Sequence, residues 1–457
     1  MTFNVTKFVL MLIHPIICCE IKTFSRFSQW KKWSFWAVLM LFLSVGCRPL
    51  KKIQVNRTIK KSEVLSNHFT GFCLFDPSEN TYLVQRNENL NFTPASNMKI
   101  LTAYTCLEAF GDSIPAFAYT DYIDSLVIKP LGDPSFLHPV FKSQPAYDFF
   151  SGRKKILIQN NHGSLSEFGP GWAWDDFQYN FQAERSWFPI YGNTVRILNL
   201  NDTLQIVPNF FEDYVQIQFG TKPGNYVSRD VKYNLFNIWI ENEHEDFERE
   251  IPFDYDEELL IQLLEDTLHL EVALLDSSDI QPEQILNNQA ALDVISYMMQ
   301  TSDNFLAEQL LIQAALHEGF ADPDQFRAYK LQQWSSFNPN PIQWHDGSGL
   351  SRYNLITPLS LVSILNRIYQ TESWQTIKSI FPAGGHSGTL ANWYYSDPPF
   401  IFAKTGTLSN NHNLSGYLVT DSGKKLIFSL MNNNYVTSTS EVKQAMSELL
   451  FKIKKLY

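Results

Sequence analysis

Three short motifs carry side chains that could do chemistry together, and they stand in a fixed order along the 457 residues of the chain. The first is Ser-Asn-Met-Lys at 96–99, the second is Ser-Asp-Asn at 302–304, and the third is Lys-Thr-Gly at 404–406. A serine hydroxyl becomes a good nucleophile only when a neighbouring base takes its proton. A spacing of three residues places a serine and a lysine on the same face of a helix. The motifs therefore predict a serine acyl-transfer enzyme that uses lysine as its base.

Each motif residue has a chemical role in this interpretation. Ser96 is the nucleophile and Lys99 is its base. Lysine is protonated at neutral pH, so Lys99 can act as a base only if burial or a nearby cation lowers its pKa, and Lys404 could supply that cation. Ser302 could relay a proton to the leaving amine, and Asn304 could hold a substrate amide.

The third motif predicts how the substrate is held. Lys404 and Thr405 could bind a substrate carboxylate, which suits a peptide that ends in a free C-terminus. An oxyanion hole needs two backbone N–H groups that point at the reacting carbonyl oxygen. We expect these to be the N–H groups of Ser96 and Thr407.

The bare Ser-x-x-Lys pattern is not specific, because it occurs five times, beginning at Ser28, Ser96, Ser151, Ser422 and Ser440. Ser96 differs from the others in its context. Pro94 stands just before it, and residues 101–110 continue as a plausible helix. A proline ahead of a helix start is a good initiation signal, so the context favours Ser96.

The Ser-x-Asn pattern also recurs, at 78–80 and 409–411. Only 302–304 has helical periodicity on both sides, at 291–299 and 305–311, which predicts a connector between two helices. The alternative is a simple helix N-cap, since Ser and Asn both cap helices well.

Lys-Thr-Gly occurs once, directly after the apolar run Phe-Ile-Phe-Ala at 400–403 that predicts a strand. The alternative is a solvated strand end followed by a glycine turn. The order of the three motifs, each in the right structural setting, favours one joint active site.

With these three motifs the chain resembles a known family, the class C low-molecular-mass penicillin-binding proteins of the penicillin-binding protein 4 type. Members of this family are D-alanyl-D-alanine carboxypeptidases/endopeptidases. The likeness covers about residues 60–457. Beyond the three motifs it rests on Gly-Asp-Pro-Ser at 132–135, Trp-Ala-Trp-Asp-Asp-Phe at 172–177, Asp-Gly-Ser-Gly-Leu-Ser-Arg at 346–352, Gly-Thr-Leu at 388–390 and Leu-Ser-Gly-Tyr at 414–417.

The resemblance implies a fold and an activity. The fold would be an α/β (α+β) penicillin-binding transpeptidase/β-lactamase-like domain, an antiparallel sheet flanked by helices, with mostly-β inserted domains. The enzyme would act on peptidoglycan stem peptides through an acyl-enzyme on Ser96, would be inhibited by β-lactam antibiotics, and would need no cofactor. Asp133 and Arg352 would contact the free end of the diamino-acid side chain in the stem.

Two alternatives stay open from the sequence. One is a β-lactamase-like hydrolase or esterase on the same scaffold, which would differ in its rate of deacylation. The other is a non-catalytic cell-wall-binding relative. The intact residues Ser96, Lys99, Ser302 and Lys404 argue against the second alternative, because an inactive relative commonly loses one of them.

The length predicts more than one domain. About 200 residues separate Lys99 from Ser302, which is enough for an inserted domain. Strand-like runs at 125–129, 202–207 and 214–219 indicate that the insert is mostly β. We expect a signal segment at 1–47, a tether at 48–60, a penicillin-binding domain formed by 61–112 and 281–457, and the insert at 113–280. The first and last strands of the penicillin-binding domain should join into one antiparallel sheet, followed by a closing helix at 440–454.

The N-terminal segment indicates export. Two lysines at 31–32 precede the apolar run 33–43, and small residues then lead to Cys47. This order is typical of a lipoprotein signal, although Ser44 stands where leucine is commoner. We expect a lipidated Cys47 that holds the protein at the membrane on the periplasmic side of the cell envelope. The alternative is an ordinary signal peptide or an uncleaved anchor.

Charge, cysteine content and histidine spacing bear on nucleic-acid binding, disulfide bonds and metal sites. A net charge of −11 argues against nucleic-acid binding, which needs a basic face. If Cys47 is lipidated, Cys73 and Cys106 remain, either as a disulfide or as two buried thiols. No metal site is predicted, because the chain has no His-Glu-x-x-His motif or clustered Cys/His spacing. His244, in the acidic run 241–250, is a weak candidate on what we interpret as a solvated face.

Overall fold

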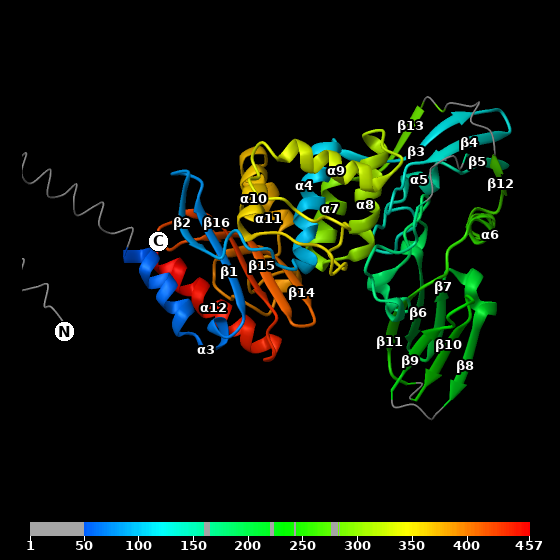
Figure 1. The fold of residues 1–457 in the computed structure, drawn as a ribbon. Helices are drawn as coiled ribbons and strands as arrows, with labels where there is room; N and C mark the ends of the chain where they lie inside the picture. Colours follow the sequence, from blue (N-terminus) through cyan, green and yellow to red (C-terminus); the bar gives the residue numbers. More distant parts are fainter. Residues whose placement is uncertain (1–49, 160–164, 220–223, 242–243, 276–281, 283) are drawn as a thin grey trace, which may run out of the picture. The chain divides into compact units, whose positions relative to one another are not determined.

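The computed structural model describes residues 50–159, 165–219, 224–241, 244–275, 282 and 284–457. A five-stranded antiparallel sheet, in the order β14-β15-β16-β1-β2, joins the two ends of this chain (Figure 1). Its strands are β1 (Phe69–Asp76), β2 (Thr81–Arg86), β14 (Ile401–Leu408), β15 (Asn411–Val419) and β16 (Lys425–Asn433). The predicted joining of first and last strands is confirmed.

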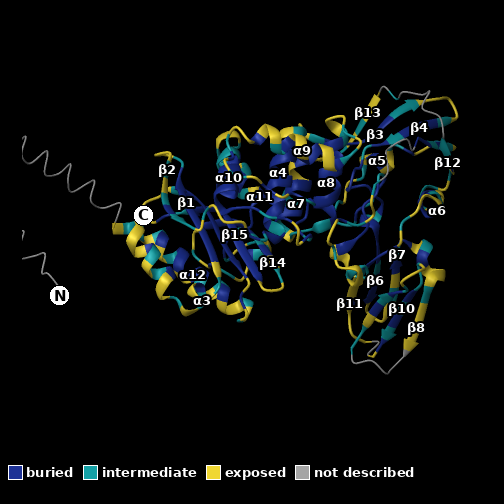
Figure 2. Ribbon diagram, viewed as in Figure 1, coloured by how far each residue is buried: buried dark blue, intermediate teal, exposed yellow. Residues whose placement is uncertain are grey.

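Helices cover both faces of this sheet, because its strands are apolar on both sides. In β1, Phe72 and Leu74 belong to one buried cluster, while Cys73 and Phe75 belong to another. Alternate residues of a strand point to opposite faces, so each face has its own core. Figure 2 shows the buried strands between the two layers of helices.

One helical layer carries the first two of the three motifs. It contains α4 (Lys99–Ala109), α7 (Ala291–Thr301), α8 (Asn304–His317), α9 (Pro323–Trp334), α10 (Pro358–Thr371) and α11 (Trp374–Ile380), with the 3-10 turns η1 (Ala95–Met98) and η6 (Gly388–Leu390). The other layer contains α3 (Glu63–Ser66) and the closing helix α12 (Thr439–Leu456). Ser438 and Glu441 form a capping box at the start of α12, which fixes where this predicted helix begins.

The chain leaves this domain after α4 and returns at α7. Between them lies a mixed sheet in the order β12-β5-β4-β3-β13, together with two three-stranded sheets, β11-β6-β7 and β8-β10-β9. The strands are β3 (Ser113–Asp121), β4 (Ser125–Pro130), β5 (Lys155–Gln159), β6 (Thr194–Leu200), β7 (Thr203–Val207), β8 (Val215–Phe219), β9 (Tyr226–Arg229), β10 (Phe236–Ile240), β11 (Phe247–Pro252), β12 (Glu271–Leu275) and β13 (Gln284–Ala290). Short helices and 3-10 turns connect them: α5 (Pro145–Asp148), η2 (Trp174–Asp176), η3 (Asn180–Gln182), η4 (Tyr191–Asn193), η5 (Asn209–Tyr214) and α6 (Glu257–Leu268).

The insert has its own aromatic core, in which Phe117 packs against Phe136, Phe150 and Phe188. Its sheet also reaches beyond the predicted limit at residue 280, because β13 pairs with β3. The insert therefore extends to Ala290. This difference arises because strand pairing over more than 160 residues leaves no local trace in the sequence.

The predicted tether at 48–60 also differs from the structure. Residues 55–61 are helical, and Val55 and Ile59 are buried in the same cluster as α12. Their spacing of four residues places both on one helix face. The polar composition of 48–60 therefore predicted a tether, although this face packs against the domain. The predicted signal segment 1–47, with Cys47, lies outside the described residues.

Cys73 and Cys106 are both buried free thiols, which decides between the two alternatives left open by the sequence. Burial raises the pKa of each thiol. Within the described ranges, no helix is long and apolar enough to cross a membrane.

Candidate active site

The nucleophile candidate lies where a 3-10 turn becomes a helix. Ser96 is half-buried in η1, and α4 begins at Lys99. Lys99 Nζ lies 3.1 Å from Ser96 Oγ, so the predicted same-face arrangement of serine and lysine is present.

Two glycines let other segments approach this turn closely. A Cβ on Gly406 of β14 would lie 2.8 Å from the side-chain nitrogen of Asn97 and closer still to the carbonyl of Pro94. A Cβ on Gly349 would collide with the carbonyl of Ala95, and Gly349 also has a φ of +85°. Only glycine fits at these two positions, which press the third motif and the loop 346–352 against the Ser96 turn.

Lys99 is fully buried and surrounded by hydrogen-bond acceptors. Its Nζ lies 2.6 Å from Asn304 Oδ1 and 2.8 Å from the carbonyl oxygen of Ser348, in addition to Ser96. Burial lowers the pKa of Lys99 to about 8. A lysine with this pKa is neutral in a useful fraction of molecules near neutral pH, as a general base requires.

Three carboxylates, those of Asp303, Asp346 and Glu308, oppose this lowering of the Lys99 pKa. Of the two causes that the sequence left open for a lowered Lys99 pKa, burial and the nearby cation Lys404, burial is the main one. Lys404 is itself fully buried, and burial, together with the charge of Lys99, lowers its pKa well below the ordinary value.

The second motif lies on the connector between α7 and α8. Ser302 ends α7 in a left-handed conformation with a φ of 65°, and the side chain of Asp303 caps α8 by accepting the N–H of Leu306. Because Asp303 takes the capping role, the Ser302 and Asn304 side chains are turned to other partners. Ser302 Oγ accepts a hydrogen bond from Lys404 Nζ at 2.9 Å, and Asn304 Oδ1 accepts one from Lys99.

The third motif lies on β14, the edge strand of the sheet. An edge strand leaves one row of backbone groups without a neighbouring strand, which suits the binding of an extended peptide. Thr405 Oγ1 donates to Thr389 Oγ1 at 2.8 Å. Thr407 is exposed, and its Oγ1 lies 2.7 Å from His412 Nδ1.

The two residues expected to contact the stem side chain differ in their exposure. Arg352 is exposed at the end of the loop 346–352. Asp133 is buried, its Oδ1 accepts hydrogen bonds from Ser135, and its Oδ2 accepts one from Asn288 at 2.8 Å. Burial raises the pKa of Asp133 to about 6. The described hydrogen bonds of Asp133 thus remain within the insert and do not reach the three motifs.

Comparison with known proteins decides the family. Residues 51–201 and 255–453 match the D-Ala-D-Ala carboxypeptidase 3 (S13) family, which is most of the chain. The chain belongs to this family. It is a serine-type D-Ala-D-Ala carboxypeptidase of peptidase family S13.

Individual relatives agree with this assignment. The D-alanyl-D-alanine carboxypeptidase DacB of Haemophilus influenzae is 23% identical over 464 residues, covering 92% of this chain and 96% of the relative. The penicillin-sensitive carboxypeptidase A of Dictyostelium discoideum is 22% identical, covering 84% of this chain and 86% of the relative. The crystal structure of penicillin binding protein 4 from H. influenzae covers 88% of this chain and 99% of its own, with a TM-score of 0.69 and 23% identity. The predicted fold is therefore confirmed.

Sequence reasoning missed several residues of this S13 site. Asp346 accepts hydrogen bonds from the N–H groups of Gly349 and Ser351 and from the side chain of Asn354, which folds the loop 346–352 around it. Glu308 accepts the N–H of Ser348 at 2.7 Å. One signal was available: Glu308 follows Asn304 by four residues on an apolar helix, where a buried carboxylate is unusual.

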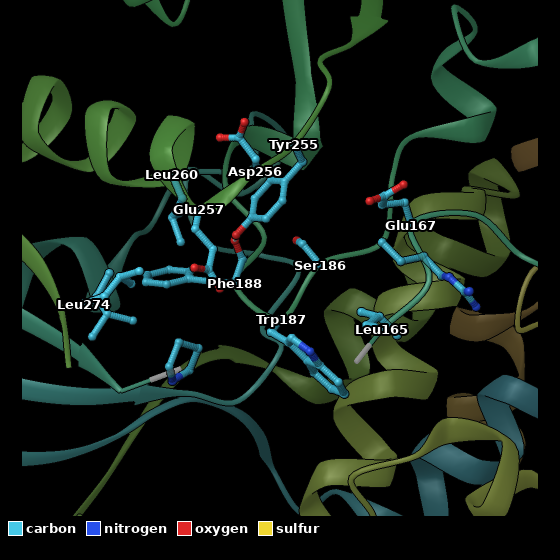
Figure 3. Close-up of a pocket in the computed structure, with 13 residues that line it drawn as sticks. Leu165, Glu167, Ser186, Trp187, Phe188, Tyr255, Asp256, Glu257, Leu260 and Leu274 are labelled. Atoms are coloured by element: carbon cyan, nitrogen blue, oxygen red, sulfur yellow. The ribbon is translucent and has the colours of Figure 1, made fainter. Parts of the chain in front are cut away.

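The insert of this S13 protein also reaches the site. The carbonyl oxygen of Phe181, in η3, accepts a hydrogen bond from the side chain of Asn304 at 2.9 Å. A cavity of about 440 Å³ lies within the insert, lined by residues such as Trp187, Tyr255 and Leu260 (Figure 3). None of the three motifs lines this cavity, so it is separate from the acyl-transfer site.

No group of His, Cys, Asp and Glu side chains within the described residues could hold a metal ion. His244 is exposed, and its Nδ1 lies 2.9 Å from Asp202 Oδ1.

Proposed function

We propose that this enzyme cleaves the D-Ala–D-Ala bond of peptidoglycan stem peptides through an acyl-enzyme on Ser96, and that β-lactams acylate the same serine. The observation that carries the proposal is the buried Lys99 amine, with a pKa of about 8, at 3.1 Å from the Ser96 hydroxyl. Membership of the S13 family supports it. So does the H. influenzae relative, whose structure has also been solved in complex with a novel β-lactam.

Acylation begins when neutral Lys99 takes the Ser96 proton and Ser96 Oγ attacks the carbonyl carbon between the two D-alanines. The negative charge that develops on the carbonyl oxygen is stabilised by the backbone N–H groups of Ser96 and Thr407. The C–N bond then breaks, and the proton that Lys99 took from Ser96 passes through Ser302 to the leaving amine of the terminal D-alanine, so Lys99 is neutral again. Ser302 Oγ also accepts a hydrogen bond from Lys404 Nζ. The products are free D-alanine and an ester on Ser96.

Deacylation uses the same base a second time. Lys99 takes a proton from a water molecule, and the resulting hydroxide attacks the ester carbonyl carbon. The bond to Ser96 Oγ breaks, and the serine oxygen recovers a proton from Lys99. The shortened stem peptide leaves as a carboxylic acid.

Substrate binding follows from the charges along β14. We propose that Lys404 and Thr405 bind the terminal carboxylate of the stem peptide, or the carboxylate of a β-lactam. Exposed Arg352 binds the free end of the diamino-acid side chain. Asp133 stays a prediction for the same contact, and its bonds to Ser135 and Asn288 mean that binding would require these bonds to rearrange.

We also propose that the protein is exported and that a lipid on Cys47 anchors it in the cell envelope on the periplasmic side. The support is the order of basic residues, apolar run and small residues before Cys47. This location would bring the enzyme to its peptidoglycan substrate.

Labelling with a fluorescent penicillin tests the catalytic assignment. Wild-type protein should be labelled covalently, and Ser96→Ala should abolish the label. Ser440→Ala is a matched control, because Ser440 also heads a Ser-x-x-Lys pattern but lies exposed on α12. Labelling that survives Ser96→Ala would contradict the proposal.

The fate of the label and of the substrate tests the reaction type. A peptidase should stay acylated by penicillin for minutes or longer, whereas a β-lactamase would release it rapidly. Incubation with purified muropeptides and mass spectrometry should show loss of a terminal D-alanine, cleavage of cross-links, or both. Rapid penicillin turnover with unchanged muropeptides would instead favour the β-lactamase alternative.

A further inference from the structure

A buried pair of charged side chains, one of them in the insert, lies behind the loop residue that contacts Lys99. We propose that Glu308 on α8 and Arg185 in the insert are positioning residues: together they hold the carbonyl group of Ser348 against Lys99, so the insert sets the geometry of the base. This inference rests on the proposed function, in which Lys99 deprotonates Ser96.

On the side of α8, a single residue connects Glu308 to the base. Glu308 Oε1 accepts the N–H of Ser348 at 2.7 Å, and the carbonyl oxygen of the same Ser348 accepts a hydrogen bond from Lys99 Nζ at 2.8 Å. Glu308 has a relative exposure of only 2%. Because Ser348 is held at both its N–H and its carbonyl, a shift of Glu308 would move the acceptor that fixes the Lys99 amine.

On the side of the insert, Arg185 is held rigidly. Its Nε and Nη2 donate to the carbonyl oxygen of Ser166 at 3.0 and 2.8 Å, and Nη2 also donates to that of Phe168 at 2.9 Å. The remaining nitrogen, Nη1, lies 3.8 Å from Glu308 Oε2. A guanidinium fixed in this way can restrain the carboxylate without paying further side-chain entropy.

A second insert side chain reinforces the same loop. The Arg185 guanidinium lies over the ring of Trp172, at 5.7 Å from its centroid. Trp172 Nε1 donates to Asp346 Oδ2 at 2.9 Å, and Asp346 is the centre of the loop that contains Ser348. The insert therefore supports the Ser348 loop at two points, one through each carboxylate.

The charges around Lys99 determine how the pair should act. The carboxylates of Asp303, Asp346 and Glu308 face it and favour its protonated form, while burial and the charge of Lys99 lower the pKa of the neighbouring Lys404. Burial and Asp346 raise the pKa of Glu308, and Arg185 and the N–H of Ser348 oppose that rise by favouring its carboxylate form.

Loss of either member of the pair should release the Ser348 carbonyl from its position. Glu308→Gln also removes a negative charge near Lys99, whereas Arg185→Gln removes a positive charge from the pair. Removal of the Glu308 carboxylate lowers the pKa of Lys99, so in Glu308→Gln the part of the acylation profile that reports deprotonation of Lys99 should move to lower pH.

The test compares Arg185→Gln and Glu308→Gln with a matched control, Arg229→Gln. Arg229 is also an insert arginine with low exposure, it lies 3.7 Å from a buried glutamate, Glu184, and its guanidinium is 5.2 Å from the centroid of an aromatic ring, Phe177. It differs in that Glu184 is not a partner of the Ser348 loop. The measurement is the rate constant of acylation by a fluorescent penicillin between pH 6 and 9, with melting temperatures recorded in parallel.

We expect Arg185→Gln and Glu308→Gln to lower the plateau of the acylation rate by about tenfold or more, and Glu308→Gln also to move the limb of the pH profile to lower pH. Arg229→Gln should stay within about twofold of the wild type at equal loss of melting temperature. Equal rate losses in Arg185→Gln and Arg229→Gln, or an unmoved limb in Glu308→Gln, would overturn the inference. Glutamine has nearly the same shape as glutamate, so Glu308→Gln can still be tested if Arg185→Gln fails to fold. An unlabelled wild type would instead refute the proposed function itself.

Discussion

Replacing Gly406 by alanine should separate β14 from η1, the turn that contains Ser96. The φ of Gly406 is not in the left-handed region, so alanine is conformationally allowed and only space opposes it. The new Cβ would lie 2.8 Å from Asn97 Nδ2 and 2.9 Å from Asn97 N, and closer still to the carbonyl oxygen of Pro94. Ordinary contacts begin at about 3.5 Å, so β14 and η1 must separate by roughly 1 Å.

The separation should harm catalysis more than folding. Lys404 lies two residues before Gly406 and Thr407 directly follows it, so the proposed substrate-binding amine and the predicted oxyanion N–H move away from Ser96 together. A misplacement of about 1 Å can reduce a rate about 100-fold. Overpacking of this kind typically costs about 2 kcal/mol of unfolding free energy, which an S13 domain of this size should tolerate.

The assay is the rate constant of acylation by a fluorescent penicillin, measured with urea unfolding of the same variants. Gly111→Ala is the control, since a Cβ at Gly111 meets no atom within 4 Å. We expect Gly406→Ala to acylate about 100-fold more slowly while remaining folded, and Gly111→Ala to match the wild type. Acylation of Gly406→Ala at the wild-type rate would refute the argument that close contact between β14 and η1 aligns the site.

Two further predictions concern pH. Since burial lowers the pKa of Lys99 to about 8, the acylation rate should rise about tenfold per pH unit from pH 6 and level off above pH 8; a flat profile over pH 6 to 9 would contradict Lys99 as the base. Burial raises the pKa of Asp133 to about 6 in the folded state, so the folded protein holds this proton more tightly than the unfolded chain, and stability must fall as pH rises through this range. Compared with Asp133→Asn, the wild type should lose about 2 kcal/mol of unfolding free energy between pH 4 and 7, measured by urea denaturation, and parallel curves for the two proteins would show that the carboxylate is not held in this way.

Parts of this protein could be predicted because they depend on neighbours in the chain. The Ser96–Lys99 contact follows from helical spacing, and α12 follows from its apolar periodicity and the Ser438 cap. The connector that carries Ser302 was visible from the helical patterns on either side of it.

Other parts depend on residues that are far apart in the sequence. The pairing of β13 with β3 lengthened the insert, and the burial of Val55 and Ile59 against α12 turned an expected tether into packed helix. Hydrophobic composition alone does not predict which distant segment will cover a given face of a helix or sheet, because the packing partners depend on the whole fold.

The sequence by itself was enough to predict a serine-type peptidase, because the three motifs supply a candidate nucleophile, a candidate base and a candidate carboxylate-binding amine. Only the tertiary structure decided the surroundings of the predicted base. It removed Lys99 from water, placed Asn304 and the Ser348 carbonyl around its amine, and brought Glu308 and the insert residue Arg185 behind Ser348. The physical reason is that a pKa depends on desolvation and nearby charge, and both come from residues that meet only after the chain has folded.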